Sequence, residues 1–440
     1  MSVGDDLEAR QRKHVMFTWS AQGSAASVRI SGGRGATFVD HDGREFLDFE
    51  SQVFNCNAGH GQASISEAIA SQASTLSCAH PAAVFEAKAA LGERLARVTP
   101  EGISKFFLCL SGAEANENAL KMARFLTGRS KIIARRRSYH GASMGALSLT
   151  GDPRRWAAEP GLWGVERIED PYCYRCPFGQ TYPACGVQCA EHLEHVIQME
   201  GPERIAAVFI EGVTGANGGF VPPPEYWPRL RELCTKYGIL LVADEVFTGF
   251  GRTGKWFAVD HWDVQPDLIT MGKGITSGYA PLGAVGLTDR VAAHFDERAL
   301  QCGLTNYAHP IACAAANATI DLYERDDLIG NAARMGEVLK RGLEALRAKH
   351  EVVGDARNLG LFGTLELVTD RVLKTPLVPY NGALIQGSKA ARLKLALHRR
   401  GLHILLRWNN LFIAPPLCID EDDLNRGLLL IDDALTEVFA

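Results

Sequence analysis

The sequence predicts an α/β protein whose main part is a large, mostly parallel sheet, followed by a smaller α+β domain. Two continuous apolar runs of strand length, at residues 205–210 and 239–243, suit strands that are buried on both faces of such a sheet. Before them, the apolar residues of segment 115–126 recur with helical spacing. Helices that alternate with buried strands indicate a parallel sheet covered by helices.

Three parts follow one another along the chain. Short strands with turn signals between them are expected at residues 28–30, 37–39 and 45–49, and an amphipathic helix at 335–346 opens the last part. No linker rich in Pro, Gly or Ser separates the parts, so we expect them to pack tightly and share a site. The expected division is an N-terminal segment that packs with the small domain (1–60), a large domain (61–330) and a C-terminal small domain (331–440).

Composition excludes several classes of protein. Of the 440 residues, 46% are hydrophobic and 22% are charged, which is ordinary for a globular chain and rules out disorder, collagen or a coiled-coil rod as a whole-chain description. There are 46 Lys and Arg against 51 Asp and Glu, which gives a formal net charge of -5. Such a balance provides no basic surface for nucleic acid or for an acidic membrane.

The same survey gives an expectation for the compartment. No apolar run reaches the ~20 residues that span a bilayer, and residues 1–6 are acidic and lack the apolar stretch of a signal peptide. Eleven cysteines in such a chain favour reduced thiols or a metal site over a disulfide scaffold. We therefore expect a cytoplasmic protein.

Three polar residues follow apolar runs of the predicted sheet. Glu211 and Asp244 come directly after the two buried strands, at the strand ends where open α/β sheets bind ligands. Lys273 stands between two glycines after a further short apolar run. In a pocket poor in water its pKa falls and it becomes a usable nucleophile. Taken singly, such carboxylates often only cap loops, and most lysines are solvated surface groups.

A phosphate site is suggested by the small residues that lead into the helix at 115–126. Ser111, Gly112 and Ala113 would expose backbone N–H groups at its N-terminus, where the helix dipole favours an anion, although Ser111 is also an ordinary N-cap. A phosphate cradle, a carboxylate at a strand end and a lysine able to form an imine are together what pyridoxal phosphate (PLP) requires.

Several motifs resemble those of the class III PLP-dependent aminotransferases, which have the fold-type I architecture. The chain carries them in the family's order, and the resemblance covers roughly residues 15–435. They are SGAEAN (111–116), YHG (139–141), DEVFTGFGRTG (244–254), GKG (272–274) and TNYAHP (305–310). TWSAQ (18–22) and KWFA (255–258) make the chain most similar to the ω-amino-acid and taurine-type branch.

The resemblance implies a role for each matching residue of the coenzyme site. Lys273 would bind the coenzyme as an imine and move the substrate proton, and Asp244 would hold a proton on the pyridine nitrogen. The other residues assigned to the coenzyme are Ser111, Gly112, Ala113, Tyr139, His140, Glu211, Val246 and Thr305. Tyr139 and Val246 would sandwich the ring. Thr305 would reach the phosphate of the neighbouring subunit, so a homodimer with shared active sites, possibly within a tetramer, is the expected unit.

The substrate side is expected to contain Arg407, Trp19 and Phe54. Arg407 aligns with the family's carboxylate-binding arginine, and a guanidinium suits bidentate carboxylate binding. A structural ion pair is the alternative. Where several branches pair this arginine with a glutamate, the chain has Ala216, which would leave Arg407 free to engage a keto acid or to turn away from an amine. Phe247 stands where many members have a glutamine.

A cysteine-rich insertion at residues 171–190 does not follow from the family core. Its four cysteines have the spacing C-x2-C-x8-C-x3-C, and they are Cys173, Cys176, Cys185 and Cys189. Four thiolates suit either a [4Fe–4S] cluster or zinc. The short loops and Pro177 favour the cluster, with zinc and free or disulfide-bonded thiols as alternatives.

The predicted function is transfer of an amino group from an ω-amino acid, taurine, a diamine or an amine, through PLP, to a keto acid such as pyruvate. A PLP-dependent aminomutase of the same fold is the alternative. The glycines of segment 249–254 also fit a dinucleotide-binding fingerprint, but an aromatic stretch follows them and no amphipathic helix begins there.

Overall fold

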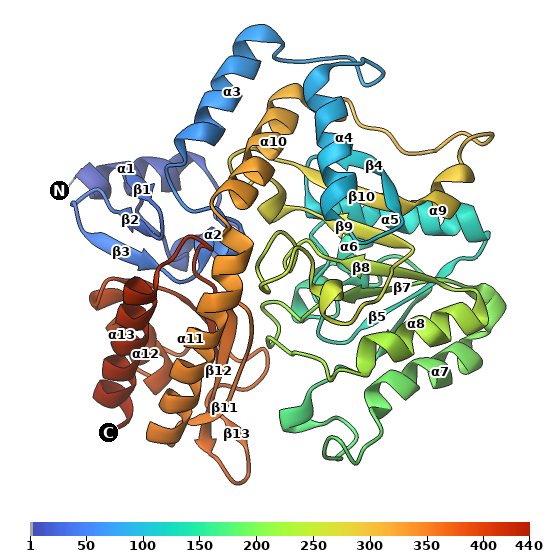
Figure 1. Ribbon diagram of the computed structural model, residues 1–440. Coiled ribbons are helices and arrows are strands. Elements are labelled where there is room, and N and C mark those ends of the chain that lie inside the picture. The colour runs from blue at the N-terminus through green and yellow to red at the C-terminus, as the bar shows by residue number, and fades with distance from the viewer. Residues whose placement is uncertain (1–2) are drawn as a thin grey trace.

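A seven-stranded sheet forms the centre of the computed structural model, which describes residues 3–440 (Figure 1). Met1 and Ser2, part of the acidic start considered above, lie outside these residues. In spatial order the strands are β4 (Ile103–Cys109), β10 (Gly283–Thr288), β9 (Leu268–Met271), β8 (Leu240–Asp244), β7 (Ile205–Glu211), β5 (Lys131–Arg135) and β6 (Val165–Ile168). Only β10 runs antiparallel to its neighbours. The predicted large, mostly parallel sheet is therefore confirmed.

Helices on both faces of this sheet explain why its strands are apolar without alternation. Every residue of β7 is buried. Ala207 and Phe209 pack into the core under α5 (Gly112–Thr127), whereas Val208 and Ile210 pack into the core that contains α7 (Gln188–Glu200) and α8 (Tyr226–Tyr237). Side chains that alternate along the strand thus all find apolar partners.

Two smaller sheets complete the fold. One has the order β11 (Val353–Leu359), β12 (Phe362–Asp370), β16 (Asn410–Ile413) and β15 (Leu405–Arg407), with β13 (Thr375–Pro376) paired to β12. The other joins β1 (Gly32–Arg34), β2 (Thr37–Val39) and β3 (Glu45–Asp48) to β14 (Leu402–His403). Figure 1 shows the blue N-terminal strands beside the red C-terminal helices α12 (Lys389–Arg399) and α13 (Glu421–Phe439).

The first predicted strand is wrong by four residues. We expected a strand at 28–30, but β1 spans Gly32–Arg34 and pairs with β2 from Gly32 opposite Val39 to Arg34 opposite Thr37. Gly35, with φ +55°, lies in the tight turn between the two strands. The turn leaves residues 28–30 beyond the end of β2.

The remaining elements pack around these sheets. The α-helices are α1 (Val3–His14), α2 (Ser51–Phe54), α3 (Ala63–Thr75), α4 (Glu86–Val98), α6 (Met144–Leu149), α9 (Asp289–Ala293), α10 (Pro310–Arg325) and α11 (Leu328–Lys349). The 3-10 helices are η1 (Gln22–Ser24), η2 (Pro153–Ala158), η3 (Cys173–Arg175), η4 (Pro202–Arg204), η5 (Ala258–His261) and η6 (Lys273–Ile275). Among residues 3–440, no helix is both long and apolar enough to cross a membrane.

The buried Arg252 ties the parts of the chain together. Its guanidinium donates hydrogen bonds to Asn57 Oδ1 (2.9 Å), to the carbonyl of Leu361 (3.1 Å) and to the carbonyl of Pro415 (2.5 Å). These acceptors belong to the N-terminal segment and to two loops of the C-terminal part. The arginine of the DEVFTGFGR motif thus fixes the small sheets against the large one.

Candidate active site

The candidate site lies where β7, β8 and β9 end. Glu211 is opposite Asp244 in the register of β7 and β8, and Asp244 is opposite Thr270 in the register of β8 and β9. Lys273 follows two residues after β9 ends. The parallel register therefore brings the predicted carboxylates and the predicted lysine to one edge of the sheet, as expected for an open α/β fold.

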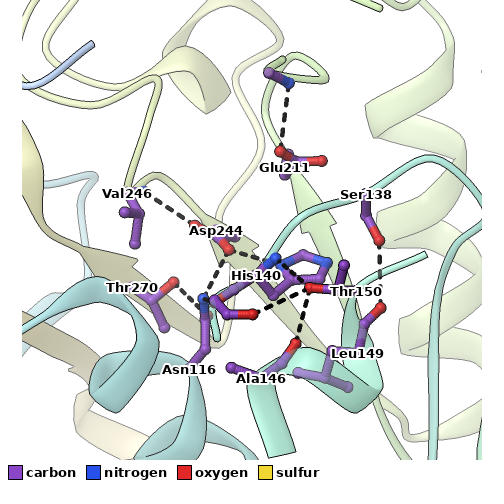
Figure 2. Close-up of polar contacts among 12 residues, drawn as sticks. Asn116, Ser138, His140, Ala146, Leu149, Thr150, Glu211, Asp244, Val246 and Thr270 are labelled. Carbon is purple, nitrogen blue, oxygen red and sulfur yellow. Dashed lines mark hydrogen bonds and ion pairs between the residues drawn. The ribbon is translucent and has the colours of Figure 1, made fainter. Parts of the chain in front are cut away.

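Asp244 is almost fully buried and accepts hydrogen bonds on both carboxylate oxygens (Figure 2). Its Oδ2 lies 2.6 Å from His140 Nδ1 and accepts a hydrogen bond from Asn116 Nδ2 at 2.8 Å. Its Oδ1 accepts a hydrogen bond from the backbone N–H of Val246 at 3.0 Å. These three contacts fix the orientation of the carboxylate at the end of β8.

A second layer of contacts orients the partners of Asp244. Thr270 Oγ1 donates to Asn116 Oδ1 at 2.9 Å, which turns the amide nitrogen of Asn116 toward Asp244 (Figure 2). The backbone N–H of His140 donates to Thr150 Oγ1 at 3.0 Å. Sequence reasoning gave Asn116 no role of its own, although it lies within the SGAEAN motif, and that position was the only signal for it.

Lys273 has the properties of a reactive amine. Burial lowers its pKa to about 8, against the opposite pull of the Asp244 and Glu211 carboxylates. Its Nζ lies 5.2 Å from the ring centroid of Phe247 and 5.9 Å from that of Phe54. Its backbone has φ 40°, which is unusual for a residue with a side chain and typical of functional sites.

The N-terminus of α5 approaches the same place. Ser111 caps the helix by accepting a hydrogen bond from the N–H of Glu114 (3.2 Å). A Cβ on Gly112 would lie 2.4 Å from Val246 Cγ1, and a Cβ on Gly272 would lie 3.2 Å from the Gly112 nitrogen. The helix N-terminus therefore packs directly against Val246 and against the residue before Lys273. A cradle for an anion, a buried carboxylate and an amine are thus combined, and these groups fit PLP.

Glu211 lies beside this group in a buried environment. Burial raises its pKa to about 7, although the Arg135 guanidinium, 3.6 Å from Oε2, acts in the opposite direction. Its Oε1 accepts a hydrogen bond from the N–H of Gly215 at 3.3 Å (Figure 2). Glu211 therefore also shapes the turn that follows β7.

On the proposed substrate side, Arg407 forms an ion pair, which was the alternative considered for it, with a partner that the sequence did not indicate. Its Nη2 lies 3.2 Å from Oδ2 of Asp152, a buried residue that caps η2. Arg154 binds the same carboxylate, and its guanidinium carbon lies 3.5 Å from the ring centroid of Tyr139 and 5.5 Å from that of Trp19. No motif marked Asp152 or Arg154, because neither the family signatures nor hydrophobic periodicity includes them.

Phe54 is placed by an unusual backbone. Each residue of α2 has positive φ, from 49° at Ser51 to 64° at Val53. This left-handed conformation costs roughly 1–2 kcal/mol per residue and persists only where packing offsets it. Phe54 packs edge-on against Phe247 with ring centroids 5.0 Å apart, and Ala216 packs against the same apolar cluster. Trp19 is 58% exposed, and Thr305 is exposed on the loop before α10.

The four cysteines of the insertion line one small cavity of about 20 Å³. Cys189 is buried on α7, whereas Cys173 begins η3 and is exposed. In the part of the chain that the structure describes, no three His, Cys, Asp or Glu side chains come together so that they could hold a metal ion. This geometry gives the predicted iron–sulfur or zinc centre no support, because Cys173 faces solvent while Cys189 is fixed in the core.

The sequence between residues 19 and 435 matches the family Aminotransferase class-III. The chain belongs to the class III aminotransferases. The predicted family, the PLP dependence and the fold-type I architecture are thereby confirmed. The match includes the glycines of segment 249–254, so their fit to a dinucleotide-binding fingerprint is a coincidence of spacing.

Relatives of this aminotransferase cover nearly its whole length. A taurine–pyruvate aminotransferase of Bilophila wadsworthia is 36% identical over 98% of this chain and 97% of its own. A diaminobutyrate–2-oxoglutarate transaminase of Halomonas elongata is 35% identical over 99% and 98%. The crystal structure of taurine:2-oxoglutarate aminotransferase from Bifidobacterium kashiwanohense, in complex with PLP and glutamate, has a TM-score of 0.94 at 37% identity and covers 99% of this chain and 98% of that one.

Proposed function

We propose that this aminotransferase transfers the amino group of an ω-amino acid, taurine, a diamine or an amine to a keto acid, either pyruvate or 2-oxoglutarate. The observation that carries the proposal is that Lys273, a buried amine whose pKa is lowered to about 8, lies at the same edge of the sheet as the buried Asp244 carboxylate. The donors and acceptors named for the relatives belong to these same chemical classes.

PLP, when bound, supplies an electron sink for the substrate carbon that carries nitrogen. Lys273 would hold the coenzyme covalently and move the proton between substrate and coenzyme, for which an amine with a pKa near neutrality is suited. Asp244 would keep a proton on the pyridine nitrogen, with His140 and Asn116 holding the carboxylate in place.

Other residues would position the coenzyme. Ser111, Gly112 and Ala113 would bind its phosphate at the α5 N-terminus, and Tyr139 and Val246 would enclose its ring. Glu211 would shape the pocket beside Asp244. Thr305, which is exposed, would complete the phosphate site of a partner subunit, so the proposed unit is a homodimer that could assemble further into a tetramer.

Arg407 would bind the carboxylate of the keto acid, with Trp19 and Phe54 shaping the pocket for the donor. Several branches have a glutamate at the position of Ala216. Here Asp152, and not a residue at that position, pairs with the Arg407 guanidinium. Asp152 approaches from a different element, so Arg407 keeps a carboxylate partner when no acidic substrate is present.

For the insertion we propose thiolate binding of a [4Fe–4S] cluster, with zinc as the alternative. The spacing of the four cysteines, Cys173, Cys176, Cys185 and Cys189, supports it, and a metal would have to draw the exposed Cys173 inward. Metal analysis of protein prepared without oxygen tests the idea. If the protein contained neither iron nor zinc, the proposal would be wrong.

A panel of donors with either pyruvate or 2-oxoglutarate tests the main proposal. We expect alanine or glutamate to form in proportion to the donor consumed. The panel should contain taurine, β-alanine, a diamine and 1-phenylethylamine. An amino acid that is isomerised without consumption of keto acid would instead favour the aminomutase, and no reaction with any donor would contradict both.

A further inference from the structure

A cavity of about 320 Å³ beside the cysteine-rich insertion is rich in arginine. Its walls come from the loop after β5, from β6 and the residues that follow it, and from the insertion itself. The arginines that line it are Arg136, Arg137, Arg155, Arg167 and Arg175. The described residues of the lining include two carboxylates, Glu169 and Asp170, but neither Arg154 nor Arg407. The cavity is therefore distinct from the proposed keto-acid site.

Three of the five arginines already have a carboxylate partner. The pairs and their nitrogen–oxygen distances are Arg136–Glu169 (2.6 Å), Arg155–Glu159 (2.6 Å) and Arg175–Glu366 (2.8 Å). Asp170, the other carboxylate of the lining, is buried and lies 3.9 Å from the buried Arg135. The acidic side chains around the cavity are thus already engaged.

Arg137 and Arg167 differ from the other three. Among the described residues, neither forms an ion pair with a carboxylate. Nη2 of Arg167 donates to the carbonyls of Ser148 (2.7 Å) and Thr150 (3.0 Å), and the guanidinium carbon of Arg137 lies 4.4 Å from the ring centroid of Tyr380. In both arginines Nε is buried and has no hydrogen-bond partner. A buried donor that is left unpaired destabilises the protein, so both side chains favour a further acceptor.

The charges around Arg167 favour an acceptor that is negative. Burial lowers the pKa of Arg167 to about 10, and the positive charges of Arg155 and Arg136 act in the same direction, against the pull of Glu159. An anion in the cavity would reduce this repulsion. A phosphate group carries about two negative charges and three strong acceptor oxygens. It can therefore accept hydrogen bonds from two guanidinium groups at once, whereas a carboxylate has only two oxygens to share.

We propose that this cavity binds a phosphate group, and that Arg137 and Arg167 hold it. The planar fork of each guanidinium suits phosphate oxygens. The volume exceeds that of the ion alone, and the rings of Trp156, Tyr172 and Tyr380 also line the cavity. Free phosphate and a small phosphate ester share the required chemistry. The inference does not depend on the proposed transamination, because no reacting group lies in the cavity.

Arg137 connects this cavity to both of its neighbours. It is two residues before Tyr139, which is proposed to enclose the coenzyme ring. On the other side its guanidinium carbon lies 5.5 Å from the ring centroid of Tyr172, at the start of the insertion. A phosphate bound to Arg137 would therefore lie between the insertion and the loop of the coenzyme site. The insertion would thus form one wall of a ligand site without holding a metal.

A second cavity of the large domain offers a matched control. It is lined by Arg231 and Arg290, and both guanidinium groups bind the carboxylate of Asp267, at 2.8 Å and 2.5 Å. Its arginines are therefore already paired. Arg290→Gln and Arg137→Gln make the same chemical change in two cavities, and only the second removes a proposed phosphate ligand.

Calorimetric titration of the holoenzyme with inorganic phosphate and with phenyl phosphate tests the proposal. In the holoenzyme the coenzyme fills the phosphate site proposed at the α5 N-terminus. We expect both probes to bind, and Arg137→Gln to weaken both at least about 10-fold, because a charge-assisted pair is lost. Arg290→Gln and Arg407→Gln should leave both affinities within about twofold. Tighter binding of phenyl phosphate would assign the site to phosphate esters, and equal binding would assign it to free phosphate.

The absence of binding by both probes would overturn the proposal, and so would unchanged binding in Arg137→Gln. An equal loss in Arg407→Gln would place the phosphate in the keto-acid site and would overturn it as well. If Arg137→Gln does not fold, Arg137→Lys replaces it. This variant keeps the charge but loses the fork, and it should weaken the binding of both probes several-fold.

Discussion

Two buried carboxylates, Asp244 and Asp152, lie on the proposed coenzyme side and the proposed substrate side of the candidate active site, and their surroundings differ. Asp244 is contacted by an imidazole, an amide and a backbone N–H, each placed by a different element. Asp152 is contacted by two partly exposed guanidinium groups that compete for one oxygen. The first arrangement leaves little freedom and suits a fixed coenzyme. The second contains an excess of positive charge that an acidic substrate can neutralise, so it suits a ligand that comes and goes.

The strongest test of the coenzyme side is Lys273→Ala. Because the amine is the only group proposed to bind PLP covalently and to move the proton, turnover should fall by at least about 10³-fold. The yellow absorbance of the bound coenzyme should also be lost. Spectra and initial rates measure both effects. Lys255→Ala is the control, because Lys255 is exposed and donates to the carbonyl of Asp260. Full activity in Lys273→Ala would refute the assignment.

Asp244→Asn tests whether charge or shape matters beneath the ring nitrogen. The variant keeps the volume of the side chain but removes the negative charge, so kcat should fall about 10²- to 10³-fold. Coenzyme content, measured by absorbance, shows whether the loss concerns the chemical step or binding. A fully loaded variant with unchanged kcat would show that the three donors around Asp244 serve structure alone.

Arg407→Ala should have a smaller and more selective effect. The rate constant kcat/KM for keto acids should fall about 10- to 100-fold, because a charge-assisted hydrogen-bonded pair is lost. The value for a simple amine such as 1-phenylethylamine should change far less. Half-reactions with each substrate separate the two values. Equal losses for both substrates would favour a purely structural ion pair with Asp152.

The smallest expected effect is a pH dependence of coenzyme uptake. Only the deprotonated amine of Lys273 can react with the aldehyde, and burial lowers the pKa from 10.5 to about 8. The deprotonated fraction therefore rises as the pH passes 8, and the rate of PLP uptake by the apoenzyme should increase about fivefold between pH 7 and pH 8 and level off above about pH 9. Stopped-flow absorbance measures it. A rise centred near pH 10.5 would mean that the amine is solvated.

The parts of the molecule that could be predicted share a physical basis. β7, β8 and α5 follow from local hydrophobic periodicity, and Asp244 and Lys273 follow from their positions after buried strands. Periodicity does not predict where a strand ends, because strand ends depend on pairing register. For this reason the sequence did not show that β7 extends through Glu211, or that the first strand lies at Gly32–Arg34.

Other features escaped prediction because they arise between distant segments. Arg407 and Asp152 are 255 residues apart in the chain, and no local sequence pattern around either residue predicts that they form a pair. The left-handed turn of α2 contains no glycine that would indicate it, so only its packing against Phe247 and Phe362 explains why it persists.

The sequence by itself determined the fold class, the family and the residues that are proposed for the coenzyme site, since short motifs and regular apolar spacing encode them within a few residues. The tertiary structure alone decided how the charges of the substrate side are shared. It also decided that the four cysteines gather around one cavity without forming a group that could hold a metal in the described residues. Such arrangements depend on where separate elements meet, and the side chains at those meeting points carry no periodicity or spacing that a linear reading can detect.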